Sequence, residues 1–277
     1  MEIDPFIEAQ YVFWDRSPVR TTVYAEIAES SARERACSPT LLDQPYGDHV
    51  RECVDLFPGQ DKRPLLVFLH GGYWRSHHKD RYAFVANALR QSGFSIAVVG
   101  YPLAPERPLA AIVQSLGRAM HWLHNAGSRL LPAWRGTIVA GHSAGGHLAA
   151  MLASDAVLGP RIAGCLALSG VFDLEPLSRT SIGMEIGLDP EMATRLSPLA
   201  RPAGTGWLIA AVGANETRAF QDQASRYVAH WASANGAAEQ IVVPAADHYS
   251  ILRQLADLRS PVLQRLLARA DTLEVAL

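Results

Sequence analysis

Continuous apolar runs that alternate with amphipathic stretches are the feature that most limits how this chain can fold. The runs are not broken by polar residues, which is typical of strands covered on both faces of a sheet. They lie at residues 65–70, 95–101, 136–142, 162–170, 207–213 and 239–244. Helical periodicity marks the stretches Tyr82–Gln91, Ala110–His124, His147–Ser154 and Phe220–Ala234. This alternation predicts an α/β fold with a mostly parallel central sheet flanked by helices.

Two segments depart from the alternation. Residues 1–48 are polar and irregular in pattern, and we expect an N-terminal extension, partly helical, over one edge of the site. The earliest strand is expected within His49–Phe57. Residues 171–202 are rich in Gly, Pro, Ser and Met, which predicts a cap insertion of short helices. We interpret 1–277 as a single domain with these two additions.

Composition and charge exclude several classes of protein. The formal net charge is -2 and no Lys/Arg run is present, which argues against nucleic-acid or anionic membrane partners. The N-terminus has no signal-peptide pattern, and no apolar stretch approaches the roughly 20 residues needed to span a bilayer. The three cysteines indicate neither disulfides nor a zinc site. We therefore expect a cytoplasmic protein with a small-molecule substrate, and a homodimer is compatible with the sequence.

The segment Gly-His-Ser-Ala-Gly at residues 141–145 follows one apolar run and immediately precedes a helical stretch. A serine in such a sharp strand-to-helix corner needs small neighbours, and glycines two residues before and after it meet that need. The corner projects the Ser143 hydroxyl above the carboxyl end of the sheet. This context favours a nucleophile over an incidental turn, and it predicts the α/β-hydrolase fold.

The first strong strand ends in His70-Gly71-Gly72-Tyr73-Trp74. Acyl transfer needs backbone N–H groups directed at the tetrahedral oxyanion, and a glycine pair lets the backbone approach the substrate. We predict that the N–H groups of Gly72, Tyr73 and Ala144 form this oxyanion hole. His70 is interpreted as structural. Trp74 is a candidate for the pocket wall, with a core position as the alternative.

The base should be a histidine that follows a late strand, because this fold orders its residues as Ser, acid, His. Only His248 has both that order and a strand-loop-helix context. The acid should follow the strand at 207–213, and Glu216 is the next acidic residue. Asp173, after the preceding strand, remains the alternative. The predicted catalytic set is Ser143, Glu216 and His248.

Other patterns indicate no cofactor. His121 and His124 lack a carboxylate at zinc spacing and are interpreted as a surface pair. His77 and His78 are expected to face solvent. No glycine-rich nucleotide-binding motif occurs, so neither a metal nor another cofactor is predicted.

Taken together, the segments HGGYW, GHSAGGHL and DHYSIL resemble the kynurenine formamidase (arylformamidase) branch of the α/β hydrolases, which is close to the hormone-sensitive-lipase-like esterases. YPLAPERPL and PYGDHVRECVDLFPG extend the resemblance over roughly residues 43–255. It implies a cofactor-free hydrolase with Ser143 as nucleophile, His248 as base, and Gly72 and Tyr73 as oxyanion donors. In that branch the acid is usually Asp, where this chain has Glu216.

The expected activity is cleavage of a small acyl amide or ester, with N-formylkynurenine as the substrate that the resemblance implies. A carboxylesterase acting on short-chain or aryl esters is the alternative. A non-catalytic binding protein of the same fold is a more remote alternative, because such proteins usually lose the serine or the histidine.

Overall fold

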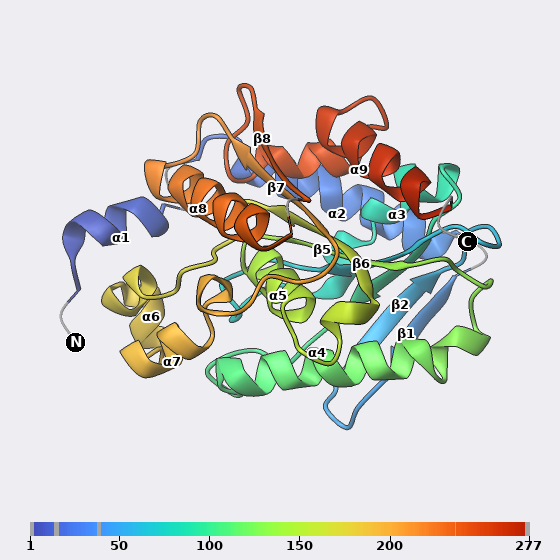
Figure 1. Ribbon diagram of the computed structural model, residues 1–277, viewed down its shortest axis with the longest axis horizontal. Helices are drawn as coiled ribbons and strands as arrows, with labels where there is room; N and C mark the ends of the chain where they lie inside the picture. Colours follow the sequence, from blue (N-terminus) through green and yellow to red (C-terminus); the bar gives the residue numbers. More distant parts are fainter. Residues whose placement is uncertain (1–2, 14–16, 38–39, 236, 275–277) are drawn as a thin grey trace.

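An eight-stranded sheet in the order β1-β2-β4-β3-β5-β6-β7-β8 forms the centre of the protein (Figure 1). The computed structural model describes residues 3–13, 17–37, 40–235 and 237–274. The strands are β1 (Leu41–Pro45), β2 (Cys53–Phe57), β3 (Leu65–Leu69), β4 (Ser95–Val99), β5 (Thr137–His142), β6 (Ile162–Leu168), β7 (Trp207–Gly213) and β8 (Ala238–Val243). From β4 to β8 all neighbours are parallel, whereas β2 pairs antiparallel with both β1 and β4.

The six apolar runs form strands β3 to β8, as predicted. Every residue of β3, β4, β5 and β7 is buried, because helices cover both faces of the sheet. Side chains alternate along β3: Leu65, Val67 and Leu69 join one hydrophobic core, and Leu66 and Phe68 join the other.

The predicted position of the first strand is wrong, because β1 at Leu41–Pro45 precedes it. This strand is at the edge of the described sheet, pairs with β2, and leaves most of its side chains partly exposed. Its sequence contains Asp43, Gln44 and Pro45, so it has no continuous apolar run by which to recognise it.

Helices pack on both faces of the sheet (Figure 1). One core includes side chains of α4 (Leu109–His124), α5 (Ala144–Ala153) and α8 (Arg218–Asn235). The other includes side chains of α2 (Arg20–Ala36), α3 (Val85–Gln91) and α9 (Pro261–Asp271). Short 3-10 helices connect elements at Lys79–Tyr82 (η1), Gly127–Arg129 (η2), Gly159–Arg161 (η3), Ser250–Leu255 (η6) and Thr272–Glu274 (η7).

The N-terminal extension and the cap segment contact each other. The extension contributes α1 (Pro5–Tyr11) and α2. The segment at 171–202 forms short helices as predicted, namely η4 (Pro176–Arg179), α6 (Ser181–Glu185), α7 (Pro190–Arg195) and η5 (Pro198–Ala200). The Glu8 carboxylate accepts hydrogen bonds from the Ser181 backbone N–H at 2.8 Å and from its hydroxyl at 2.5 Å. Thus two segments far apart in sequence are tied together at one end of the sheet.

The parallel register brings several strand ends to the same edge of the sheet. Leu69 at the end of β3 is paired with Gly141 in β5, and Gly213 at the end of β7 is paired with Val243 in β8. The loops that follow these strands carry all the residues predicted for the site. Among the described residues, no helix has both the length and the apolarity to cross a bilayer.

Candidate active site

Ser143 occupies the strained corner that its sequence context predicted. Strand β5 ends at His142 and helix α5 begins at Ala144, which leaves Ser143 at φ 56° and ψ -119°. A side chain on Gly141 would collide with the Gly145 carbonyl, and one on Gly145 would collide with the Leu69 carbonyl. These close backbone contacts explain why both positions flanking the corner are glycine.

A continuous hydrogen-bonded chain links Ser143, His248 and Glu216. The Ser143 Oγ lies 3.0 Å from His248 Nε2, and His248 Nδ1 lies 2.8 Å from Glu216 Oε2. A carboxylate can only accept here, so the imidazole carries its proton on Nδ1 and presents Nε2 as an acceptor to the serine hydroxyl. Three side chains linked in this way can act as a nucleophile, a base and an orienting acid.

Glu216 is held by donors that the chain supplies from two neighbouring strands. Its Oε1 accepts from the Ser169 hydroxyl at 2.6 Å and from the Gly213 backbone N–H at 2.7 Å. Its side chain is fully buried. With three donors on two oxygens, the carboxylate has one orientation that satisfies them all.

A hydrogen bond from the His142 ring holds the loop that carries His248. Burial holds the pKa of His142 well below its usual value, so its ring is neutral. The His142 Nε2–H donates to the His248 carbonyl oxygen at 2.7 Å. Phe13 from the N-terminal extension packs edge-on against the His248 ring, with ring centroids 5.4 Å apart.

The loop after β3, which carries two of the predicted oxyanion donors, has an unusual backbone conformation. Gly72, at φ 115°, accepts from the backbone N–H and the hydroxyl of Ser76 through its carbonyl, each at 3.0 Å. Tyr73 also has positive φ, at 49°. Within the described chain, no acceptor pairs with the N–H of Gly72 or of Ala144, the first residue of α5. These groups are therefore available beside Ser143.

His70 has the structural role predicted for it. It is fully buried, its ring stacks on Tyr101 with centroids 4.2 Å apart, and its Nδ1 lies 2.7 Å from the Gly71 carbonyl. The Tyr101 hydroxyl donates to the His70 carbonyl at 2.6 Å. Burial lowers the pKa of His70 to about 3, so it is neutral and supports the loop rather than exchanging protons near neutral pH.

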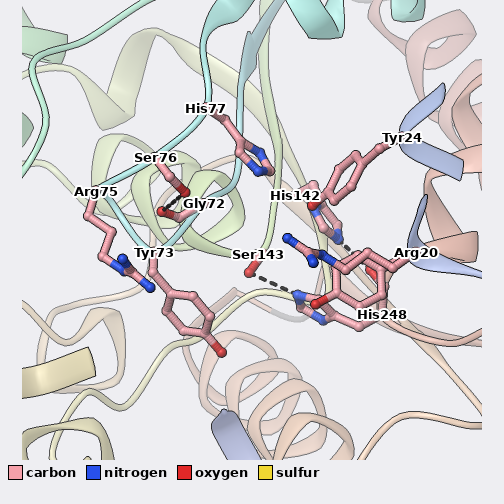
Figure 2. A pocket seen from close by; sticks show the side chains of 11 residues that line it. Arg20, Tyr24, Gly72, Tyr73, Arg75, Ser76, His77, His142, Ser143 and His248 are labelled. Carbon is pink, nitrogen blue, oxygen red and sulfur yellow. Dashed lines mark hydrogen bonds between the residues drawn. The ribbon is translucent and has the colours of Figure 1, made fainter. Parts of the chain in front are cut away.

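A cavity of about 370 Å³ opens over Ser143 (Figure 2). It is lined by Arg20, Tyr24, Gly72, Tyr73, Arg75, Ser76, His77, His142, Ser143, His248 and Tyr249. This is the size of a small-molecule site, and Tyr24, Tyr73 and Tyr249 give it aromatic walls. The N-terminal extension contributes to it directly through α2.

A family model described as the α/β-hydrolase fold matches residues 66–252. The chain belongs to this family. A kynurenine formamidase of Danio rerio is 31% identical over 244 residues, which cover 83% of this chain and 82% of that protein. The carboxylesterase NlhH of Mycobacterium tuberculosis is 35% identical over 169 residues, which cover 55% of this chain and 51% of that protein. With such relatives, the chain is a hydrolase.

Solved structures agree on the fold. A protein of Silicibacter sp. that is proposed to be a thioesterase has a TM-score of 0.83 and 27% identity, and the match covers 96% of this chain and 98% of that one. An esterase of the bacterial hormone-sensitive lipase family has a TM-score of 0.67 and 22% identity, with coverage of 94% and 98%. At 22% identity, the similarity to this esterase supports a shared fold and nothing more.

The alternative acid Asp173 has another partner, and so has Asp247, which precedes His248 in the sequence. The Asp173 carboxylate lies 3.0 Å from Arg226. The Asp247 carboxylate accepts from the backbone N–H groups of Tyr249 at 3.1 Å and Ser250 at 2.7 Å. Of Glu216 and Asp173, the structure brings only Glu216 into hydrogen-bond contact with the His248 ring.

The structure corrects the predicted positions of two side chains, Trp74 and His77. Trp74 does not line the cavity, so the pocket-wall prediction for it is wrong: its side chain is fully buried and its Nε1–H donates to His147 Nδ1 at 3.1 Å. His77 was expected to face solvent but lines the cavity, with its Nδ1 2.7 Å from the Tyr82 hydroxyl. Burial, and next the charges of Arg81 and Arg20, lower the pKa of His77 to about 4.

Arg20, Tyr24 and Ser169 are among the site residues that the sequence did not indicate. Arg20 and Tyr24 lie in α2, far along the chain from every motif, and no local pattern distinguishes them from a solvated helix face. Ser169 directly follows β6, and its hydroxyl bond to Glu216 depends on the pairing of β6 with β7. The sequence offers one signal for Ser169, namely that it is a polar residue at the carboxyl end of a central strand.

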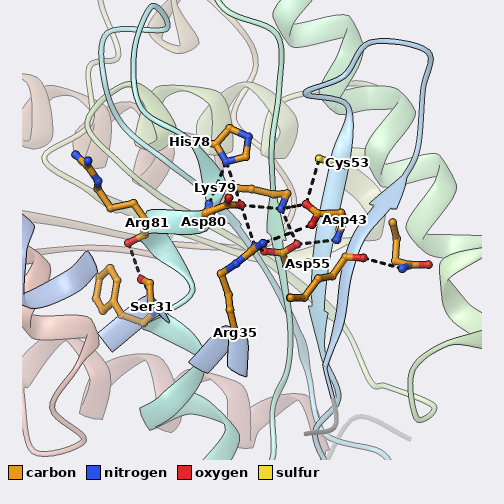
Figure 3. Close-up of polar contacts among 12 residues, drawn as sticks. Ser31, Arg35, Asp43, Cys53, Asp55, His78, Lys79, Asp80 and Arg81 are labelled. Atoms are coloured by element: carbon orange, nitrogen blue, oxygen red, sulfur yellow. Dashed lines mark hydrogen bonds and ion pairs between the residues drawn. The ribbon is translucent and has the colours of Figure 1, made fainter. Parts of the chain in front are cut away.

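A cluster of three aspartates has the spacing of metal ligands, but its carboxylates pair with a lysine and an arginine of the same chain (Figure 3). Carboxylate oxygens of Asp43, Asp55 and Asp80 lie within 4.8 Å of one another. The fully buried Lys79 ammonium lies 2.6 Å from Asp43, 2.6 Å from Asp55 and 2.9 Å from Asp80. Arg35 of α2 pairs with Asp55 and Asp80 as well. The cluster therefore fastens α2 to the sheet edge.

Proposed function

We propose that this hydrolase acts through Ser143, His248 and Glu216 on a small acyl amide or ester, and that its substrate is an aryl formamide such as N-formylkynurenine. The observation that carries the proposal is the hydrogen-bonded chain from Ser143 through His248 to Glu216 at the wall of a small cavity. The kynurenine formamidase relatives support the formamide, since they match 83% of this chain.

In the proposed mechanism, His248 Nε2 takes the proton of Ser143 as its Oγ attacks the formyl carbon. The resulting oxyanion accepts hydrogen bonds from the N–H groups of Gly72, Tyr73 and Ala144. Each such donor is typically worth about 3–4 kcal/mol of barrier lowering. Glu216 keeps the Nδ1 proton in place and stabilises the imidazolium.

The imidazolium of His248 then protonates the leaving arylamine nitrogen, and the carbon–nitrogen bond breaks. This leaves a formyl ester on Ser143. A water molecule, deprotonated by His248, attacks that ester and releases formate and the free serine. The aromatic walls of the cavity suit an aryl leaving group, because tyrosine rings offer flat apolar contact.

A carboxylesterase is the second candidate, and the 35% identity to NlhH favours it. The same residues would cleave an aryl or short-chain ester, whose leaving alcohol needs less protonation than an amine. Comparison of kcat/KM for N-formylkynurenine with that for p-nitrophenyl acetate separates the two. Efficient ester cleavage with negligible formamide cleavage would reject the arylformamidase proposal.

The nucleophile is tested with Ser143→Ala, which should lose nearly all turnover because triad members act as a unit. Labelling by a fluorophosphonate probe should disappear in the same variant. A matched control is Ser233→Ala, which removes an exposed hydroxyl of α8 that does not line the cavity. Unchanged turnover in purified Ser143→Ala protein would overturn the assignment.

A further inference from the structure

The wall of the cavity over Ser143 carries positive charge. Among the described residues that line it, two are arginines, Arg20 and Arg75, and none is Asp or Glu. The low pKa values of His77 and His142 leave both rings neutral near pH 7. Glu216 lies behind His248, where its carboxylate is fully buried. A substrate in this cavity therefore meets guanidinium groups.

The two arginines differ in their partners. Arg75 forms an ion pair with Glu185 of α6 at 2.7 Å. Arg20 forms no ion pair with any carboxylate in the described part of the chain. Its guanidinium carbon instead lies over the rings of Tyr24 and Tyr249, at 5.7 and 5.8 Å from their centroids. Stacking on ring faces leaves the N–H groups at the edge of the guanidinium plane free to bind an anion.

Arg20 is held in place by the anchoring of α2. The helix buries Val23 and Ile27 against the sheet. Its Glu26 carboxylate pairs with Arg253 through two contacts of 2.8 Å. Figure 2 shows the Arg20 side chain reaching from α2 into the cavity that contains Ser143 and His248. A guanidinium fixed in this way presents a planar pair of donors whose spacing matches a carboxylate.

We propose that Arg20 is the residue that selects substrates bearing a carboxylate, by binding that group while Ser143 attacks the acyl carbon. The proposal rests on Ser143 as the nucleophile of the proposed function, but it holds for a formamide or an ester alike. It makes α2 of the N-terminal extension a specificity element of the active site.

The test uses pairs of substrates in which a free carboxylate is compared with its neutral methyl ester. 4-Acetoxybenzoate and its methyl ester form an ester pair, and N-formylanthranilate and its methyl ester form a formamide pair. Arg20→Gln should lower kcat/KM for the anionic member about 10- to 100-fold, mainly through KM, because a hydrogen bond to a charged group is lost. The methyl esters should change less than about twofold. Arg20→Lys should recover part of the loss.

Arg81→Gln is the matched control. The Arg81 guanidinium also lies over Tyr24, at 5.6 Å, but Arg81 is exposed and does not line the cavity. It should leave the ratio between anionic and neutral substrates unchanged. Equal losses on both members of a pair in Arg20→Gln, or no loss on either, would overturn the proposal.

A binding measurement keeps this proposal separate from the proposed function. Anthranilate binding by calorimetry should weaken about 10- to 100-fold in Arg20→Gln, and this readout needs no turnover. If the protein cleaves esters but no formamide, the arylformamidase proposal fails and the Arg20 test proceeds on the ester pair. If anthranilate binds equally well to the wild type and to Arg20→Gln, the Arg20 proposal fails whatever the activity.

Discussion

Replacing Glu216 by Gln is the most informative single change, because it preserves the shape of the side chain and alters only its charge and hydrogen-bond pattern. In the native site Oε1 accepts from Ser169 and Gly213, and Oε2 accepts from His248. If the amide oxygen of Gln faces the first two donors, its NH₂ group faces His248 Nδ1. The imidazole must then move its proton to Nε2, which can no longer accept the proton of Ser143.

The size of the effect follows from this tautomer change. A carboxylate-to-amide change at the acid of a Ser-His-acid triad lowers kcat about 10⁴-fold, or about 5.5 kcal/mol at 1.36 kcal/mol per factor of ten. Turnover of an activated aryl ester by purified Glu216→Gln protein measures it. Thermal unfolding should show that the variant remains folded.

Two companion variants sharpen the interpretation. Asp173→Asn is the same carboxylate-to-amide change at the alternative acid, which pairs with Arg226, and it should keep turnover within about threefold. Glu216→Asp shortens the acid by one methylene but keeps an acceptor for Nδ1, so it should be far less damaging than Gln. The assignment of Glu216 as the acid would be refuted if the Glu216→Gln protein retained a tenth of the wild-type kcat. It would also be refuted if the Asp173→Asn protein lost its turnover.

Further predictions concern the oxyanion loop and stability. Gly72→Ala should lower kcat about 100-fold, since a Cβ at φ 115° would meet the Ser76 carbonyl and displace the donor N–H; ester hydrolysis tests this. Lys79→Met leaves three clustered carboxylates without their ammonium and should cost about 3–5 kcal/mol of unfolding free energy in urea. Burial lowers the pKa of His147 to about 4 in the folded protein. The unfolded chain therefore binds a proton at this histidine at higher pH than the folded protein does, and the free energy of unfolding falls as pH drops from about 6.5 to 4. His147→Asn should reduce that slope by about 1.4 kcal/mol per pH unit in urea titrations at successive pH values.

Much of the site was predictable because its geometry is encoded locally. The glycines around Ser143 are required by backbone contacts within a strand-turn-helix unit, so the motif and its structure coincide. His248 was found by its order and by the strand before it. Glu216 was found in the same way, and its exact partners then depended on the pairing of β6 with β7.

The residues that the sequence did not reveal are those that reach the site across the fold. Trp74 lies one position beyond Tyr73 in the same loop, yet one ring enters the core and the other lines the cavity. Nothing in the local sequence separates them. The edge strand β1 was missed for a related reason, since a half-exposed strand pairs on one side only and needs no apolar run.

The sequence by itself determined the alternating fold, the corner that holds Ser143 and the order of its proposed partners, because short-range sterics and apolar periodicity set these features. Only the tertiary structure decided that α2 forms part of the cavity wall and that Arg20 places a guanidinium there. Helix α2 is fastened by Arg35 to the buried cluster around Lys79 and by Glu26 to Arg253. Such contacts join residues distant in the chain, so no local pattern encodes them.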